Sequence, residues 1–323
     1  MPKRAECVPP QGVELIVVRG TGNKFFAEDV LDQLSYFAAG SANARDACAD
    51  ASTWRWTEAR SVAFVPPATV AATPRPLFAL PTGPRAREAY VAILRHPILR
   101  VASRYWFEGR WPQHAPEPAA KPSLGAWVNA TRLPARQSGG HLWNVPDDLY
   151  TKQFAGWRDG PMCHHGSAGC RGGLAEENLE KAIHALATHV DALLITEWLA
   201  APGQIEWLAR KFCFATDGRG GFDGATAPSW WHFPNARRAG GGHHGRRPAG
   251  WAPDLADLEL LVDLNSWDLR LFASAADTVR RRIRASAGAA LADALPALAP
   301  SDAPGLRARL RACPAPTDRR TAC

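Results

Sequence analysis

The chain has 323 residues, of which 46% are hydrophobic and 21% charged, a composition that is ordinary for a globular protein able to bury a sizeable core. Its 38 Lys and Arg outnumber its 31 Asp and Glu, and the net charge of +7 suits anionic ligands, although no basic stripe with interleaved aromatics indicates nucleic acid. No window approaches the ~20 apolar residues of a membrane span, and Met1 to Pro10 lack the apolar stretch of a signal peptide.

The N-terminal part predicts a strand, a loop and a helix. Val13 to Val18 form an apolar, β-rich run, a turn follows over Arg19 to Asn23, and apolar residues recur at helical spacing from Phe25 to Phe37. Ser61 to Val65 predicts a short second strand. The proline-rich segment from Val65 to Pro84 predicts a loop, in which 77–80 is a further candidate strand.

The middle of the chain predicts a buried strand over 89–95, which the proline at 97 ends, followed by a helix. Further helices are predicted over Leu124 to Thr131, Leu149 to Gly156 and Glu176 to His189, the last with a clear apolar face. A buried strand over Ala192 to Thr196 and a helix over Pro202 to Phe214 come next.

The remaining chain predicts one long helical region. Residues 215–250 form a Gly/Arg/His-rich insertion, 255–284 are helical with an interruption near Asn265, and 285–323 predict a weakly ordered Ala/Pro/Arg-rich tail. Strands that alternate with helices predict an α/β fold, a single domain with a central parallel sheet flanked by helices. We expect this domain to span 13–284 and to follow an N-terminal extension, 1–12.

Arg95 and Ser103 are the first candidate site residues. Arg95 ends the predicted strand and Ser103 lies eight residues on, in the next helix, so the two can hold one phosphate from two sides. This edge of an open parallel sheet is where α/β folds bind nucleotides. The alternative is an ordinary strand, turn and helix with solvated arginines.

Residues 94–105 resemble the 3′-phosphate-binding segment of sulfotransferases that use 3′-phosphoadenylyl sulfate. Four more blocks follow in the order of that family: 150–156, 178–182 with 194–198, 204–214, and 264–272. The closest resemblance is to heparan-sulfate 6-O-sulfotransferases and plant-type tyrosylprotein sulfotransferases. It implies a P-loop-like domain. Each block alone also fits an ordinary core helix or helix cap, and their shared order favours the family.

The resemblance implies that the loop after the first strand holds the 5′-phosphosulfate of the donor. The family's Lys-Thr-Gly-Gly-Thr-Thr-Phe corresponds here to residues 20–26, so the binding residues would be Thr21, Gly22, Asn23 and Lys24. A Gly-rich turn and a helix N-terminus suit a phosphate. The family's catalytic lysine falls on Gly20, so Arg19 or Lys24 would supply the cation for the leaving group.

The general base is a second departure from the family. The 6-O enzymes place a histidine after their second strand, whereas this chain has no histidine before His96. Glu58 is the nearest carboxylate in the chain order and becomes the candidate base, its alternative being a solvated loop residue. His96 stands where the family has an aspartate, and we expect this to alter a structural hydrogen bond.

The implied activity is transfer of a sulfuryl group from 3′-phosphoadenylyl sulfate to a hydroxyl of a heparan-sulfate-like glycan or a protein tyrosine. The alternative is a catalytically degenerate relative that binds the nucleotide or an acidic glycan. A P-loop phosphotransferase is disfavoured because no GxxxxGK[ST] run is present. Lys152, Arg237 and Arg238 are candidate acceptor-side cations, or else solvated loop charges. The resemblance implies the Golgi lumen and an N-terminal membrane anchor, which this chain does not show.

No metal is predicted. Cysteine and histidine occur together at Cys163, His164, His165 and Cys170, and again as His243 and His244, but the spacing fits no standard structural zinc site. The seven cysteines leave at least one unpaired, and Cys163 with Cys170 are the candidates for a loop disulfide. Asn129-Ala130-Thr131 is a glycosylation triplet.

Overall fold

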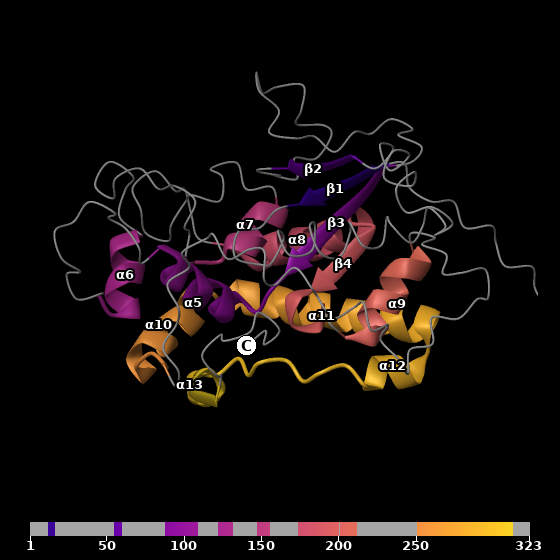
Figure 1. Cartoon of the computed structure of the whole chain (residues 1–323). Helices are drawn as coiled ribbons and strands as arrows, with labels where there is room; N and C mark the ends of the chain where they lie inside the picture. Colours follow the sequence, from indigo (N-terminus) through magenta and orange to yellow (C-terminus); the bar gives the residue numbers. More distant parts are fainter. Residues whose placement is uncertain are drawn as a thin grey trace, which may run out of the picture.

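The structure is a computed structural model that describes residues 12–16, 55–59, 88–108, 122–131, 147–155, 174–199, 201–211 and 251–312. These residues are mostly helical and carry a small parallel sheet, as expected for the α/β class (Figure 1). The strands are β1 (Gly12–Ile16), β2 (Arg55–Ala59), β3 (Glu88–Leu94) and β4 (Ala192–Ile195).

The strand order is β2-β1-β3-β4, and all neighbours are parallel. Ile16 at the end of β1 pairs with Ala59 of β2 and Ala92 of β3, whereas Leu94 at the end of β3 pairs with Ile195. All four carboxyl ends therefore meet at one edge of the sheet. The chain moves from β1 to β2 on one side and then returns to place β3 on the other side of β1.

The structure has a strand, β2, that was not predicted from the sequence. The strand predicted over 61–65 lies outside the described residues. Trp56 and Thr57 belong to the residue types that favour strands. Glu58 is consequently a strand residue in register with Leu15, and the expectation of a loop position for it was wrong.

The helix predicted over 25–37 lies outside the described residues, whereas the described helices agree closely with the ranges predicted between residues 97 and 287. They are α5 (Pro97–Glu108), α6 (Leu124–Thr131), α7 (Leu149–Phe154), α8 (Glu176–Thr188), α9 (Pro202–Lys211), α10 (Leu255–Leu264) and α11 (Ser266–Ala287), with a short 3₁₀ turn, η3 (Thr196–Trp198), after β4. The predicted interruption at Asn265 is the junction of α10 and α11. No helix in the described ranges is long and apolar enough to cross a membrane.

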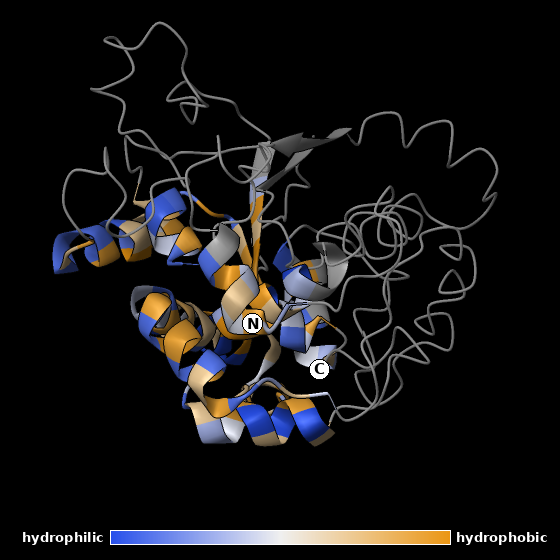
Figure 2. Ribbon diagram, turned by 90° about the vertical axis from the view of Figure 1, so that its left-hand side faces the viewer, coloured by the Kyte–Doolittle hydropathy of each residue, from blue (hydrophilic) through white to orange (hydrophobic). Residues whose placement is uncertain are grey.

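The main core forms where β3 and β4 meet α11. Residues 91–94 of β3 and all four residues of β4 are buried, as continuous apolar runs in parallel sheets are. The buried face of α11 contributes Leu271, Phe272, Val279 and Ile283, and α8 adds Leu179 and Leu186. In Figure 2 the hydrophobic residues gather where strands and helices meet in the middle of the molecule, and hydrophilic ones lie on the outer turns.

A second core cluster joins α5, α6, α10 and the C-terminal segment. Its members include Ile98, Leu99, Val128, Leu258, Leu261, Leu306 and Leu310. The last two belong to α13 (Ala303–Ala312), which follows the short α12 (Ala289–Asp293). Figure 1 shows this yellow C-terminal segment running below α11 from α12 to α13.

The expectation of a weakly ordered tail beyond residue 285 was therefore wrong for residues 285–312. Leu306 and Leu310 are 0% and 2% exposed, and the indole Nε1 of Trp198 donates a hydrogen bond to the Pro296 carbonyl at 2.8 Å. Ala299, Ala303, Leu306 and Leu310 recur at the spacing of one helix face, which the Ala/Pro/Arg bias of the segment hides.

Replacing Leu306 by alanine tests whether α13 belongs to the folded unit. The side chain is fully buried, so the free energy of unfolding should fall by about 2–5 kcal/mol in urea denaturation of the full chain. The exposed Arg311 of the same helix supplies the control, Arg311→Ala, which should leave the midpoint unchanged. Equal stability of both variants would show that α13 is not packed on the core.

Candidate functional site

The strand order places a topological switch point at the carboxyl edge of the sheet. In open parallel sheets a ligand binds where the chain switches from one side of a strand to the other, and here that point lies between β1 and β3. Ile16 ends β1 next to Ala92 of β3, and Arg95 follows β3 directly. The fold thus places the first strand's end and Arg95 at the same edge.

The Tyr150 hydroxyl fixes the backbone of Arg95. It accepts a hydrogen bond from the Arg95 N–H at 3.2 Å and donates one to the Arg95 carbonyl at 3.0 Å. Tyr150 lies in α7 and is fully buried, and burial raises the pKa of its hydroxyl, which keeps it protonated and able to donate. A position that sequence reasoning assigned to a phosphate contact is therefore held by a residue 55 positions away.

Glu197, in the 3₁₀ turn η3 that follows β4, binds the backbone of His96. Its Oε1 accepts a hydrogen bond from the His96 N–H at 3.0 Å. Burial raises the pKa of the Glu197 carboxyl, and the charges of Arg95 and Arg309 oppose that shift. In sequence Thr196-Glu197 also fitted a helix cap, and Glu197 instead binds the backbone at the entry to α5.

The Arg95 guanidinium is held in a partly desolvated position. The side chain is only partly exposed, and burial lowers its pKa, while the neighbouring Glu197 and Tyr150 oppose this change. Glu197 therefore lies where its charge acts on Arg95, and any anion that binds Arg95 must compete with that carboxylate. Ser103, the other predicted phosphate contact, is a partly exposed residue of α5.

His96 is 1% exposed and packs edge-on against Phe272, with 5.5 Å between ring centroids. Burial is the main cause that lowers the pKa of His96 to about 4; the charges of Arg95 and Arg309 add to it, and the Pro300 carbonyl opposes it. The imidazole is therefore neutral at pH 7. It lies between α5, α11 and the C-terminal segment, in the position where the resembled family has an aspartate.

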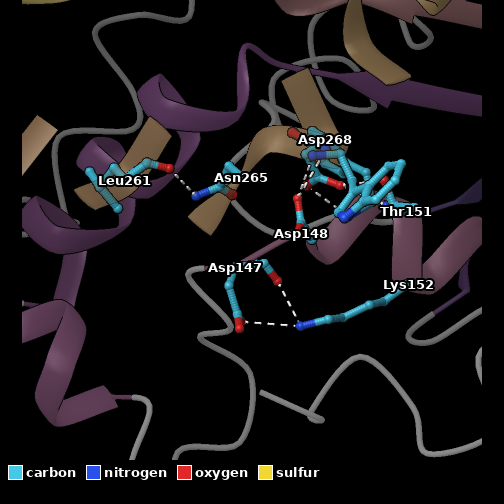
Figure 3. A network of polar contacts seen from close by, with 9 residues as sticks. Asp147, Asp148, Thr151, Lys152, Leu261, Asn265 and Asp268 are labelled. Atoms are coloured by element: carbon cyan, nitrogen blue, oxygen red, sulfur yellow. Dashed lines mark hydrogen bonds and ion pairs between the residues drawn. The ribbon is translucent and has the colours of Figure 1, made fainter. Parts of the chain in front are cut away.

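Two aspartates join the N-termini of α7 and α11 (Figure 3). Asp148, before α7, accepts hydrogen bonds on Oδ1 from the Trp267 and Asp268 N–H groups at 3.1 and 3.0 Å. Asp268, in the first turn of α11, accepts from the Tyr150 N–H at 2.9 Å and the Thr151 N–H at 2.7 Å. Each carboxyl thus binds N–H groups that the opposite helix leaves without an intrahelical partner.

Asp148 and Asp268 are both buried, and burial and neighbouring charges shift the pKa of each carboxyl. Burial and the neighbouring Asp268 raise the pKa of Asp148 to about 8, and burial raises the pKa of Asp268, with the Arg100 charge opposing. Arg100 is 2% exposed, and its guanidinium carbon lies 5.4 Å from the centroid of the Tyr150 ring. The hydroxyl of Thr151 adds a further donor to Asp268 at 2.9 Å.

Lys152 was predicted from the sequence to be an acceptor-side cation or a solvated loop charge. The structure contradicts both, because the side chain is buried and paired. It is 1% exposed, and its Nζ donates to the Asp147 carbonyl at 3.0 Å and lies 3.3 Å from Asp147 Oδ1 (Figure 3). α7 is short and fully buried, so its lysine points into the structure and is neutralised there. The buried ion pair links Asp147, which precedes α7, to Lys152 within this helix.

Several predicted site residues cannot be placed. Arg19, Thr21, Gly22, Asn23 and Lys24 lie outside the described residues, as do Arg237, Arg238 and every cysteine. Glu58 is placed by its backbone alone, in the edge strand β2. The described residues hold no group of three metal-ligating side chains, and the Cys/His segments 163–170 and 243–244 fall outside them. Asn129 is exposed near the end of α6.

Four of the sequence blocks singled out above are joined by hydrogen bonds. Arg95 and His96 contact Tyr150 and Glu197, and Tyr150 contacts Asp268. Sequence reasoning quoted these blocks but assigned no role to Tyr150, Asp148 or Asp268. The signal was a polar residue at the start of each helix, which is also the pattern of an ordinary cap.

Neither a scan against protein-family models nor a search of curated proteins finds a match to this chain.

Removing the Asp268 carboxyl should destabilise the protein strongly. Asp268→Ala leaves the Tyr150 and Thr151 N–H groups and the Thr151 hydroxyl without an acceptor in a buried place, which should lower the free energy of unfolding by at least about 3 kcal/mol. The control is Glu176→Ala, because Glu176 pairs with Arg270 at the exposed surface. Urea denaturation that shows the same midpoint for both variants would contradict the capping role.

The buried His96 should make stability fall in acid. The unfolded imidazole takes up its proton near pH 6.5 and the folded one only near pH 4, so the unfolded state binds more protons between these values. His96→Leu should remove a loss of about 3 kcal/mol between pH 7 and pH 4.

Asp148 contributes a pH dependence of the opposite sign, because its raised pKa makes folding more favourable as the pH falls below 8. This contribution is present in both the wild type and His96→Leu, so it cancels when their pH profiles are compared. Urea denaturation from pH 7 to pH 4 measures the difference, with His184→Leu on the exposed side of α8 as the control. Parallel pH profiles for wild type and His96→Leu would show that His96 does not titrate differently in the folded state.

Proposed function

We propose that the chain is a sulfotransferase that moves a sulfuryl group from 3′-phosphoadenylyl sulfate to a hydroxyl of a glycan or a protein tyrosine. The observation that carries the proposal is the placement of Arg95. It follows β3 at the switch point of a parallel sheet, next to the end of β1, whose following loop resembles the donor loop of the family. Such an edge is where α/β folds bind nucleotides.

The finer form of this proposal is a P-loop-like domain. The Gly-rich residues 20–26 would cradle the 5′-phosphosulfate with backbone N–H groups. Arg95 and Ser103 would bind the 3′-phosphate, since one is placed at the strand end and the other on the following helix. The backbone of Arg95 is held by Tyr150 and that of His96 by Glu197, which limits the positions open to the guanidinium.

In the transfer step the acceptor oxygen bonds to sulfur while the bond from sulfur to the 5′-phosphate oxygen breaks. The electron pair of that bond goes to the phosphate, so the product nucleotide is 3′-phosphoadenosine 5′-phosphate. Arg19 or Lys24 would stabilise the charge on the leaving phosphate, and Glu58 would accept the proton of the acceptor hydroxyl. The net positive charge of the chain suits an anionic acceptor.

Calorimetric titration with 3′-phosphoadenosine 5′-phosphate tests the nucleotide site. Arg95→Gln should weaken binding by about 10- to 100-fold, since hydrogen bonds to a charged group contribute about 1.5–3 kcal/mol. Arg281→Gln, on the exposed side of α11, is the matched control and should bind like the wild type. Thermal unfolding of Arg95→Gln, together with Arg95→Lys, separates loss of the charge from loss of the fold.

A sulfation assay on heparan-sulfate and tyrosine-peptide acceptors then separates the readings. Labelled sulfate on the acceptor, with 3′-phosphoadenosine 5′-phosphate as the second product, supports the enzyme. Nucleotide binding without transfer supports a catalytically degenerate relative, in accord with Gly20 at the family's lysine position. No nucleotide binding by the folded chain, or a preference for ATP with Mg²⁺, would overturn the proposal.

A further inference from the structure

Arg95 lies just beyond the paired part of the sheet. In the described residues the β1–β3 ladder ends at Ile16 with Ala92, and the β3–β4 ladder ends at Leu94 with Ile195. The peptide groups of Arg95 therefore follow the last strand pairs, at the edge where its side chain would meet a ligand. A guanidinium on a loosely held backbone would lose much conformational freedom on binding, and that loss would weaken the affinity.

The hydroxyl of Tyr150 binds the backbone of Arg95 at this point. Its single oxygen accepts a hydrogen bond from the Arg95 N–H at 3.2 Å and donates one to the Arg95 carbonyl at 3.0 Å, so it binds both polar groups of one residue. A neighbouring strand binds a strand residue in the same way, through one acceptor and one donor. The hydroxyl thus extends the pairing of β3 by one residue, with a side chain from α7.

Tyr150 is itself held in place from several sides. Its side chain is fully buried, and its backbone N–H donates a hydrogen bond to Asp268 Oδ2 at 2.9 Å. The guanidinium carbon of Arg100 lies 5.4 Å from the centroid of its ring. Side chains in a close-packed interior occupy defined rotamers, so the Tyr150 hydroxyl is a fixed point against which the backbone of Arg95 is held.

We propose that Tyr150 is a positioning residue of the nucleotide site, which acts through Arg95 and strengthens binding of the 3′-phosphate by holding the backbone that carries the guanidinium. This inference rests on the proposed function, in which Arg95 binds that phosphate. Because the backbone is fixed before the ligand arrives, fewer conformations are lost on binding and the affinity is higher. Tyr150 needs no contact with the ligand in this role.

Calorimetric titration of the full chain with 3′-phosphoadenosine 5′-phosphate tests this role. Tyr150→Phe removes one oxygen and should weaken binding about three- to tenfold, the range that the net contribution of a hydrogen bond gives. Tyr105→Phe is the matched control. Tyr105 is buried in the second core cluster, and its hydroxyl donates to the Pro122 carbonyl at 2.7 Å, so this variant should bind the nucleotide like the wild type.

A double-mutant cycle separates positioning from a general loss of structure. Combined with Arg95→Gln, Tyr150→Phe should weaken nucleotide binding no further, because its effect passes through a guanidinium that is already absent. A merely structural role would weaken binding by the same factor in both backgrounds, and that result would overturn the proposal. Urea denaturation of each variant establishes that it is folded under the conditions of the titration.

Hydrogen exchange of the wild type decides the matter should Tyr150→Phe fail to fold. Saturating nucleotide should slow exchange of the Arg95 amide proton, which bonds to Tyr150, more than that of the Trp127 amide, which bonds to the Ser123 carbonyl at the start of α6. Equal slowing at both amides is what a global gain in stability gives, and it would contradict the positioning role.

The failure of this inference is distinguishable from the failure of the proposed function. Nucleotide binding that Arg95→Gln weakens and Tyr150→Phe does not would keep the function and overturn the positioning role. Nucleotide binding that Arg95→Gln leaves unchanged would place the phosphate elsewhere, and the positioning role would again be wrong. No nucleotide binding by the folded wild type would overturn both.

Discussion

The reciprocal hydrogen bonds of Asp148 and Asp268 are the constraint on which the site depends. They bind the N-terminus of α7 to that of α11, 120 residues apart in sequence. This contact sets the position of Tyr150, the second residue of α7, whose hydroxyl in turn fixes the backbone of Arg95. The backbone of Arg95 at the sheet edge is therefore supported by a capping interaction between two other helices, α7 and α11.

A buried pair of carboxyl groups contributes little to stability unless hydrogen-bond donors satisfy its oxygens. Here the backbone N–H groups and the Thr151 hydroxyl supply those donors, and burial raises the pKa of both carboxyls. The pair therefore contributes mainly by fixing the relative positions of α7 and α11. Because α11 also packs on β4, α8 and α9, the same helix links the capped ends to the main core. The polar edge and the apolar core are thus organised by the same element.

Much of the fold could be predicted from periodicity, and the failures have physical reasons. The helical spacing of α8 and the buried runs of β3 and β4 follow from burial on defined faces, so local sequence specifies them. β2 and α13 were missed because their patterns are short or hidden by biased composition. At the site, the position of Arg95 was predictable from its strand end, whereas the roles of Tyr150 and Asp268 were not. Their roles arise from contacts across 55 or more residues, which no local pattern encodes.

The C-terminal segment joins this edge through both packing and charge. Leu306 and Leu310 bury one face of α13 against the cluster that holds Ile98 and Leu99 of α5, and Arg309 lies between those two leucines in sequence. The charge of Arg309 acts on the pKa of both His96, just before α5, and Glu197, just after β4. Packing of the C-terminal segment therefore contributes to the buried surroundings that keep the imidazole of His96 neutral.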